Sequence, residues 1–345
     1  MNEARKSAVA PGEAESAIGD LMRAIVQDRF GPPDTLRLVR AHRPGIGSGD
    51  VLLKVHAAAV NPYDWHRLRG DPRITRLMGV GLTKPKHRIA GVDVAGRVQD
   101  VGADVHDLRP GDEVFGFARG AFAEYAAADA ALVVPKPAGM SFEQAAAMPL
   151  AAVTALHAIR DRGHVQPGLR VLVNGAAGGV GTFAVQIAAA LGAEVTGVCS
   201  ARNTDMVWSL GATHVLDYAA EDFAAGTVGY DVILDNVGNR SIRDLRRAAT
   251  PTGTIVVNGG GTPGHIIGAV GDILRAAVVN LFVRRHITMV PTTWSREDLL
   301  AVTELVDTGT LRPVIDRTYP LADTAVGLQH VEAGHARGKV VITVT

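Results

Sequence analysis

A strand, a glycine-rich turn and a helix follow one another in Leu169–Gly192, and this stretch limits the possible folds more than any other. Arg170–Asn174 is a short valine-rich run, typical of a strand buried in a parallel sheet. Four glycines follow, and then an alanine-rich segment with Phe183, Ile187 and Leu191 on one helical face. Glycines let the backbone approach a pyrophosphate, and the helix after them directs free N–H groups at it. The stretch therefore predicts a dinucleotide site.

The spacing of these glycines is G-x-x-G-G-x-G from Gly175, and it differs from the common G-x-G-x-x-G pattern. We expect the dinucleotide to contact the loop formed by Gly178, Gly179, Val180 and Gly181. A turn that packs a helix onto a strand and binds nothing would use the same residue types. The glycine pattern alone leaves that alternative open.

The end of the next predicted strand, Ala193–Cys199, favours NADP(H) over NAD(H). An NAD site usually carries Asp or Glu about 20 residues after the glycines, to bind the ribose 2′-hydroxyl. Here that point carries Ser200 and Arg202 instead. A hydroxyl and a guanidinium suit a 2′-phosphate, because arginine offers phosphate oxygens a charge-assisted fork. The alternative for Arg202 is a solvated surface arginine.

Composition excludes several classes of protein. The 345 residues suffice for about two domains with a sizeable core. Lys+Arg and Asp+Glu are equal at 35 each, so no net field attracts nucleic acid or an anionic membrane. The one cysteine, Cys199, excludes an internal disulfide and a multi-cysteine zinc lobe. Without a signal-like start or a long uncharged apolar run, the chain is expected to be cytoplasmic.

The pattern of predicted strands, helices and turns divides the chain into segments. Residues 1–21 are expected to form an N-terminal tail, and residues 22–147 a β domain of short strands and Pro-Gly turns. In 148–292, strands alternate with helical lengths, which predicts a doubly wound parallel sheet. Residues 293–345 end in a strand that we expect to return to the first domain. Ile287–Val290 could be the edge strand of the sheet and pair across a homodimer.

Six motifs stand out along the chain: VNPYD (60–64), AGVDVAGRV (90–98), RPGDEVFG (109–116), GAAGGVG (175–181), SLGATHVLDY (209–218) and RGKVVITV (337–344). Together they resemble the zinc-free medium-chain dehydrogenase/reductases, near the quinone oxidoreductases. The resemblance covers Met22–Thr345. It implies an α/β fold with a GroES-like catalytic domain, completed by the C-terminal segment, and an inserted Rossmann NADP-binding domain. Substrate would react in the cleft between the two.

The resemblance also bears on the metal. Zinc alcohol dehydrogenases hold a catalytic zinc through Cys and His ligands. The segment matching their first Cys has Asn61, and the one matching Gly-His-Glu reads Gly91-Val92-Asp93, so we expect no metal. Without a Lewis acid the means of stabilising an alkoxide is lost, whereas the enolate formed from an enone or quinone needs only hydrogen bonds and a proton.

We therefore predict an NADPH-dependent oxidoreductase that reduces quinones or α,β-unsaturated carbonyls as small-molecule substrates. An aldehyde or enoyl-thioester reductase, and a nucleotide-binding redox sensor without turnover, are the alternatives. The same glycines and basic residues are compatible with all three.

The resemblance places Asn61 and Asp64 beside the nicotinamide. The Asn61 amide could bind the substrate carbonyl or the cofactor amide; alternatively, Asn61 begins a turn and Asp64 caps the next helix. Tyr63 and His66 are nearby groups that could donate a proton, although packing roles and protonation by solvent are equally open. Arg69 is expected to support the fold or the rim of the substrate site.

Further cofactor contacts follow from the resemblance and from strand order. Thr154 would face the nicotinamide, Tyr218 would flank the 2′-phosphate, and Lys339 in the terminal G-K pair would reach the cofactor. The loops after two parallel strands should also face the ligand, and their residues are Asn236, Asn258 and Gly259. A helix-core threonine, a strand-end aromatic, a solvated lysine and plain turn glycines are the respective alternatives.

Overall fold

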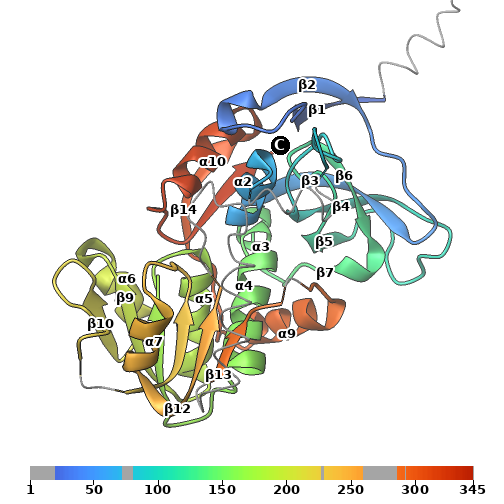
Figure 1. Ribbon diagram of the computed structural model, residues 1–345. Helices are drawn as coiled ribbons and strands as arrows, with labels where there is room; N and C mark the ends of the chain where they lie inside the picture. The colour runs from blue at the N-terminus through green and yellow to red at the C-terminus, as the bar shows by residue number, and fades with distance from the viewer. Residues whose placement is uncertain (1–19, 72–80, 227–228, 259–285, 292, 345) are drawn as a thin grey trace, which may run out of the picture.

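The computed structural model describes residues 20–71, 81–226, 229–258, 286–291 and 293–344. Two units are seen, one around a mainly antiparallel sheet and the other around a parallel sheet (Figure 1). The predicted fold class, a GroES-like β domain with a Rossmann-type α/β domain, is confirmed. Gly259 and nearly all of the predicted N-terminal tail lie outside the described residues.

The first unit is a sheet with the strand order β14-β15-β3-β4-β5-β7, in which β6 also pairs with β3. Its strands are β3 (Asp50–Val60), β4 (Asp93–Val101), β5 (Glu113–Phe117), β6 (Tyr125–Asp129), β7 (Val133–Pro135), β14 (Ile315–Pro320) and β15 (Lys339–Thr343). A separate antiparallel ribbon consists of β1 (Leu21–Val26) and β2 (Arg37–His42).

The last strand of the chain belongs to this first sheet. β15 runs antiparallel to β3, with Val340 opposite Val60 and Thr343 opposite Ala57, and its other neighbour is β14. The red C-terminal elements accordingly lie beside the blue N-terminal ones (Figure 1). The final strand therefore pairs with a strand from the first part of the chain.

The second unit is a six-stranded sheet in the order β10-β9-β8-β11-β12-β13, and every neighbouring pair is parallel. Its strands are β8 (Arg170–Asn174), β9 (Glu194–Cys199), β10 (His214–Asp217), β11 (Tyr230–Asp235), β12 (Ala249–Val257) and β13 (His286–Met289). The strand order reverses direction at β8, which is where ligands bind in open α/β sheets. β13 occupies the edge predicted for it.

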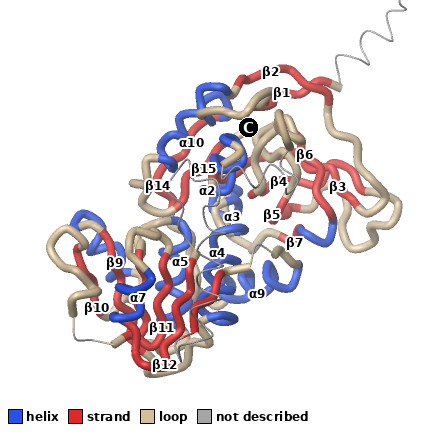
Figure 2. Tube along the Cα trace, in the orientation of Figure 1, coloured by secondary structure: helices blue, strands red, loops and turns tan. Residues whose placement is uncertain are grey.

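Helices cover this parallel sheet on both faces (Figure 2). Val171 and Val173 of β8 pack with Phe183 of α5 (Gly179–Ala190), whereas Leu172 faces the opposite cluster with Leu245 of α7 (Ile242–Ala248). Burial on both faces explains why β8 is apolar at consecutive positions. It also leaves the carboxyl ends of the strands as the place for polar groups.

The remaining helices connect or flank the two sheets. They are α2 (Pro62–Arg69), α3 (Phe142–Ala146), α4 (Pro149–Leu156), α6 (Thr204–Ser209), α9 (Arg296–Asp307) and α10 (Thr324–Glu332), and α4 continues into a π-helical turn over His157–Arg162. Among the described residues, no helix is long and apolar enough to cross a membrane.

Candidate functional site

The glycine loop between β8 and α5 is as tight as its sequence predicts. Gly175 turns the chain with a φ of 78°, and α5 begins at Gly179. A Cβ at Gly181 would lie 2.1 Å from the carbonyl oxygen of Gly175, so only glycine fits there. Gly178, Gly179 and Val180 stay partly exposed, and the first N–H groups of α5 have no acceptor within the helix. The loop is therefore a backbone cradle that suits a pyrophosphate.

Asparagine side chains join the carboxyl ends of three neighbouring strands beside this loop. Asn258 Nδ2 donates to Asn236 Oδ1 at 2.8 Å, and Asn236 Nδ2 donates to the Asn174 carbonyl at 3.2 Å. The buried Asp235 carboxylate accepts from Asn174 Nδ2 at 2.8 Å and from the Gly238 N–H at 3.0 Å. Asn236 and Asn258, predicted from strand order alone, are thus brought together at the carboxyl edge of the sheet.

A basic cavity of about 240 Å³ lies past the end of β9. Its lining residues are Arg202, Asn203, Asp316, Arg317, His330, His335 and Arg337. Arg202 donates to the His335 carbonyl at 3.1 Å, and Asp316 is already bonded to His330 Nε2 at 2.6 Å. Three guanidinium groups therefore surround a single, already partnered carboxylate, which favours an anionic ligand.

The other residues predicted around the 2′-phosphate lie near this cavity. Ser200 Oγ accepts from Asn203 Nδ2 at 3.1 Å. Tyr218 is 54% exposed, and its N–H donates to the carbonyl of Cys199 at 3.1 Å, which places it beside Ser200. The structure thus gathers Ser200, Arg202 and Tyr218 at the ends of β9 and β10.

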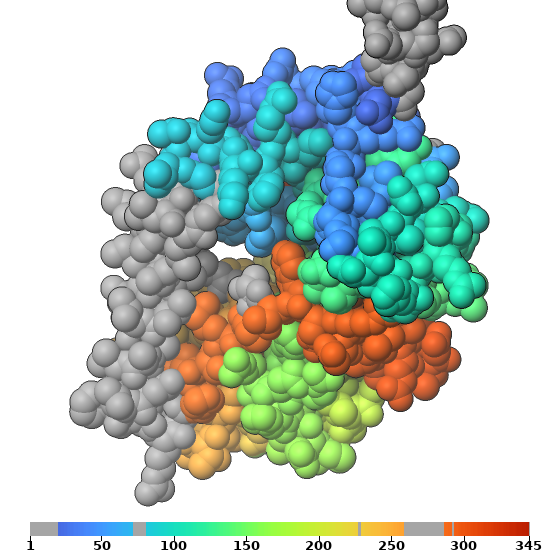
Figure 3. All heavy atoms as spheres, turned by 90° about the vertical axis from the view of Figure 1, so that its right-hand side faces the viewer, coloured from blue at the N-terminus to red at the C-terminus, as the bar shows by residue number. Residues whose placement is uncertain are grey.

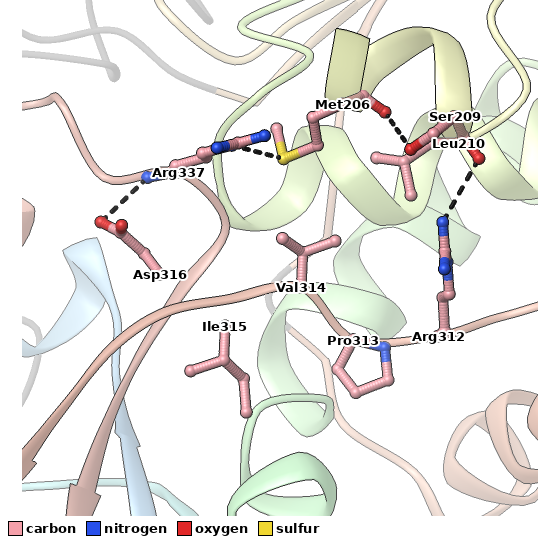
Figure 4. A pocket seen from close by; sticks show the side chains of 9 residues that line it. All are labelled: Met206, Ser209, Leu210, Arg312, Pro313, Val314, Ile315, Asp316 and Arg337. Atoms are coloured by element: carbon pink, nitrogen blue, oxygen red, sulfur yellow. Dashed lines mark hydrogen bonds between the residues drawn. The ribbon is translucent and has the colours of Figure 1, made fainter.

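Arg337 separates this basic cavity from a second one of about 350 Å³, whose lining residues are shown in Figure 4. Its Nε lies 3.2 Å from the Met206 sulfur, and its backbone N–H donates to Asp316 at 3.1 Å. A thioether is a weak partner for a guanidinium, so this side chain is available to an anion. Sequence analysis missed Arg337, although the residue opens the RGKVVITV motif.

A buried polar cluster lies where the first unit meets the glycine loop, and it consists of Asn61, Asp64, Asp93 and Lys339. Asn61 is 2%, Asp93 0% and Lys339 3% exposed. Asn61 Nδ2 donates to Asp93 Oδ2 at 2.9 Å, while Lys339 Nζ donates to Asn61 Oδ1 and lies 3.4 Å from Asp93 Oδ2. The Asn61 amide is therefore bonded at both ends within the chain.

Asp64 serves as the cap that its sequence position suggests. Its Oδ2 accepts the backbone N–H of Asn61 at 2.8 Å at the start of α2. Burial raises the pKa of Asp64 to about 7, and the neighbouring Asp93 adds to that rise. Burial also raises the pKa of Asp93, although Lys339, Asn61 and the Leu150 N–H oppose the rise by bonding to its carboxylate. Asp64 can therefore hold or release a proton near neutral pH. The catalytic roles predicted for Asn61 and Asp64 stay predictions.

Thr154 lies one turn along α4 from this cluster. Leu150, whose N–H donates to Asp93 at 3.1 Å, and Thr154 are the two partly exposed residues of this otherwise buried helix. Their spacing of four residues puts them on one helix face. The contact predicted between Thr154 and the nicotinamide stays a prediction.

Tyr63 belongs to an aromatic group that sequence analysis did not anticipate. Its ring meets Trp294 edge-on with centroids 5.8 Å apart, and Trp294 stacks on Phe117 at 4.6 Å. Arg67 Nη1 donates to the Tyr63 hydroxyl at 2.6 Å. The surface is hollowed between the first unit, blue to cyan, and the orange segment after β13 (Figure 3). Planar apolar groups of this kind suit a planar conjugated ligand.

The two other residues considered near Tyr63 have structural contacts. His66 stacks on Trp65 with centroids 3.7 Å apart, and burial lowers the pKa of His66, which keeps the ring neutral at pH 7. Arg69 pairs with Glu332 at 2.5 Å and so joins α2 to α10. These contacts favour supporting roles over proton donation.

Metal-type ligands come together elsewhere in the described part of the chain, at His157, Asp161 and Asp298. Arg160 already lies 2.5 Å from Asp161 and 3.5 Å from Asp298. His157 Nδ1 is buried without a partner, whereas histidines that bind a metal usually donate their second ring nitrogen to an acceptor. This group therefore has the features of an ion-pair network rather than of a metal site.

Comparisons with known proteins cover both units. Family models match residues 47–138 (alcohol dehydrogenase GroES-like domain) and 210–342 (zinc-binding dehydrogenase). The chain is 34% identical to the mitochondrial NAD(P)H oxidoreductase RTN4IP1 of Mus musculus, over 95% of this chain and 91% of that protein. It is 29% identical to the chloroplastic NADPH-dependent alkenal/one oxidoreductase of Arabidopsis thaliana, over 95% and 81%. The quinone oxidoreductase structure from Coxiella burnetii matches with a TM-score of 0.82 and 32% identity, over 94% and 100%.

Proposed function

The chain belongs to the medium-chain dehydrogenase/reductase family, of the quinone oxidoreductase type, and from this premise we propose that it reduces quinones or α,β-unsaturated carbonyls with NADPH and without zinc. It is an NAD(P)H-dependent oxidoreductase of that type. The observation that carries the finer proposal is the Lys339 ammonium, which lies between Asn61 and Asp93. Asn61 stands where zinc relatives have their first Cys ligand, and Asp93 stands at the Glu of their Gly-His-Glu motif.

The cofactor is NADP(H), in keeping with the names of the relatives. The glycine loop fits its pyrophosphate, and Arg202 and Arg337 in the wall of the basic cavity fit its 2′-phosphate. Thr154 would face the nicotinamide from α4, whose first turn bonds to Asp93 through the Leu150 N–H. When bound, NADPH supplies a hydride.

The residues around Asn61 do not fit a catalytic zinc. Zinc binds thiolates, neutral imidazoles and carboxylates, whereas this cluster offers an amide, an ammonium and two carboxylates that already accept hydrogen bonds from Asn61 and Lys339. The ammonium of Lys339 would repel a second cation among groups that it already neutralises. Acceptors whose reduction produces an enolate or a hydroquinone suit such a site. Hydrogen bonds stabilise the negative charge that forms on their oxygen, and a proton then neutralises it.

Two features of this chain match that chemistry. The Tyr63 and Trp294 rings, which meet edge-on, offer aromatic surface for a conjugated acceptor. Two groups could donate the proton. One is Asp64 in the buried cluster, with a pKa of about 7, and the other is the Tyr63 hydroxyl beside Arg67. Protonation by solvent remains the alternative route.

Turnover tests this proposal directly. Purified protein should oxidise NADPH in the presence of a panel of quinones and short enones, and should not oxidise simple alcohols with NADP⁺. The rates should be unchanged after dialysis against a chelator, with less than stoichiometric zinc by elemental analysis. NADPH binding without turnover on any acceptor would favour a redox sensor, and stoichiometric zinc with alcohol oxidation would refute the zinc-free assignment.

Replacing Arg202 tests the choice of cofactor. Arg202→Ala removes a charged hydrogen bond to the 2′-phosphate, and such bonds contribute about 1.5–3 kcal/mol, so the Kd for NADPH should rise about 10–150-fold. The Kd for NADH should change little, and fluorescence titration measures both. Arg243→Ala, at an exposed position of α7, is the control and should alter neither. Equal losses for the two cofactors in Arg202→Ala would contradict the assignment.

The domain division and assembly follow the same proposal. Residues 22–147 and 293–345 would form the catalytic domain and residues 148–292 the NADP-binding domain, since β14 and β15 complete the first sheet. The edge strand β13 would pair with its copy in a homodimer. A cytoplasmic location stays a prediction, because the matched RTN4IP1 protein is named mitochondrial.

A further inference from the structure

The start of β15 touches the glycine loop of the other unit. The Gly338 N–H donates to the Ala177 carbonyl at 2.8 Å, and Gly338 forms an isolated bridge with Gly178. Gly338 has a φ of 93°, and a Cβ there would lie 2.3 Å from the Val314 carbonyl oxygen. Glycine at 338 thus fits beside Val314 while its backbone bonds to the nucleotide loop.

The next residue, Lys339, adds a side-chain contact between the first unit and the glycine loop. Its stem runs over Gly179, where a Cβ would come within 3.1 Å of Lys339 Cδ. Its ammonium is anchored on Asn61, at the end of β3, and on Asp93, at the start of β4. The Lys339 side chain thus packs on the nucleotide loop of the second unit and is held by groups at the ends of two strands of its own sheet.

The charges in this cluster make the anchor strong. Asp93 is fully buried, and its remaining donors are neutral: Asn61 Nδ2 at 2.9 Å and the Leu150 N–H at 3.1 Å. Removing one partner of a buried ion pair leaves the other uncompensated, so Lys339 and Asp93 hold each other in place. Because Leu150 lies in the first turn of α4, the anchor also reaches the helix that carries Thr154.

We propose that Lys339 is a positioning residue, whose anchor on Asn61 and Asp93 fixes the glycine loop relative to the catalytic unit and so sets the affinity for NADPH. Lys339 was predicted from the family resemblance to reach the cofactor; here its ammonium acts through other residues instead. The inference rests on the proposed use of NADPH.

The test compares variants of the full chain in NADPH titration, steady-state kinetics and thermal unfolding. Lys339→Met keeps the stem and removes the ammonium, and its Kd for NADPH should rise at least tenfold. Asp93→Asn weakens the anchor without touching Lys339, and its Kd should rise at least threefold. In Lys339→Met/Asp93→Asn no buried charge is left unpaired, so Tm should recover toward wild type while the Kd stays raised.

Lys136→Met is the matched control. Lys136 is also buried and bonds to the Met140 carbonyl at 2.6 Å and to Glu113 at 3.2 Å, away from the glycine loop. This variant should lower Tm and leave the Kd within twofold of wild type.

Three results would overturn the proposal. In the first, Lys339→Met binds NADPH as tightly as wild type. In the second, the double variant regains affinity together with Tm, which would make the pair purely structural. In the third, Asp93→Asn leaves the Kd unchanged while Lys339→Met raises it, which would indicate a direct contact between Lys339 and the cofactor. Failure of the wild-type protein to bind NADPH would instead refute the proposed function.

Discussion

Gly181→Ala is expected to unfold more easily and to lose dinucleotide binding, whereas Gly178→Ala should fold normally and bind more weakly. The two glycines lie in the same loop but face different neighbours. A Cβ at Gly181 would meet the Gly175 carbonyl oxygen at 2.1 Å and the Ala176 Cα at 2.8 Å, both of which are backbone atoms. A Cβ at Gly178 would meet its nearest neighbour, the Gly175 oxygen, at 3.4 Å, and φ there is an ordinary −82°.

The expected loss of stability for Gly181→Ala is therefore about 3 kcal/mol or more, the upper end for overpacking, since β8 and α5 must move apart. Denaturant unfolding without cofactor measures it. Gly178→Ala should unfold like wild type in the same assay, because within the chain its methyl group makes only an ordinary van der Waals contact, with the Gly175 oxygen. If Gly181→Ala is as stable as wild type, the close packing of the loop described here is wrong. If Gly178→Ala binds NADPH at wild-type strength, the pyrophosphate does not approach at Gly178.

Local sequence pattern predicted the parallel sheet well. The predicted bounds of β8 agree with the structure, and β9 differs by one residue at its start. These strands are short apolar runs covered on both faces, so their composition reflects burial directly. The antiparallel unit was harder: β2, β6 and β7 were not predicted. β6 reads YAAAD, with no β-branched residue, and β2 reads RLVRAH, with one, so neither presents the β-branched pattern of a typical strand.

The candidate site also has a part that was predictable from local sequence and a part that was not. The glycine loop and the ends of β9, β11 and β12 were predictable, since each follows its strand in sequence. The cluster around Asp93 was not, because Lys339 lies 246 residues away and β15 inserts between β14 and β3 only in the folded sheet. Arg337 and Trp294 were missed for the same reason. Periodicity specifies which face of an element is buried, but not which distant element packs on it.

Asn61 and Asp64 show how one residue can fit two interpretations. The sequence allowed either a turn with a helix cap or a catalytic role for these residues. The structure contains the cap, in which the Asp64 carboxylate accepts the Asn61 N–H. The same burial that makes the cap rigid also raises the pKa of Asp64. A structural role therefore does not remove the chemical one, and only a measurement that separates stability from turnover can decide between them.

Asp64→Asn is expected to make the stability of the protein less dependent on pH. The pKa of Asp64 is about 7 in the folded chain against 3.8 for the ordinary group. Between these values the folded chain keeps a proton that the unfolded chain has lost, so wild-type stability falls as pH rises from 3.8 to about 7 and is level above that. Three pKa units correspond to about 4 kcal/mol. The variant, whose amide oxygen can still accept the Asn61 N–H, should gain that much on wild type between pH 4 and pH 8.

Denaturant unfolding at several pH values gives the difference, and Asp244→Asn is the matched control. Asp244 takes the same position in the first turn of α7, but its hydrogen bond from Ser241 lowers the pKa of this exposed carboxylate. Its contribution to stability is present above the unfolded value and is lost as pH falls, so Asp244→Asn should show no gain between pH 4 and pH 8. Parallel curves for wild type and Asp64→Asn would show that Asp64 is ionised in the folded chain like an ordinary carboxyl. If Asp64 also supplies the proton, kcat of Asp64→Asn should lose its pH dependence near 7, whereas a cap alone would leave the pH profile of kcat intact.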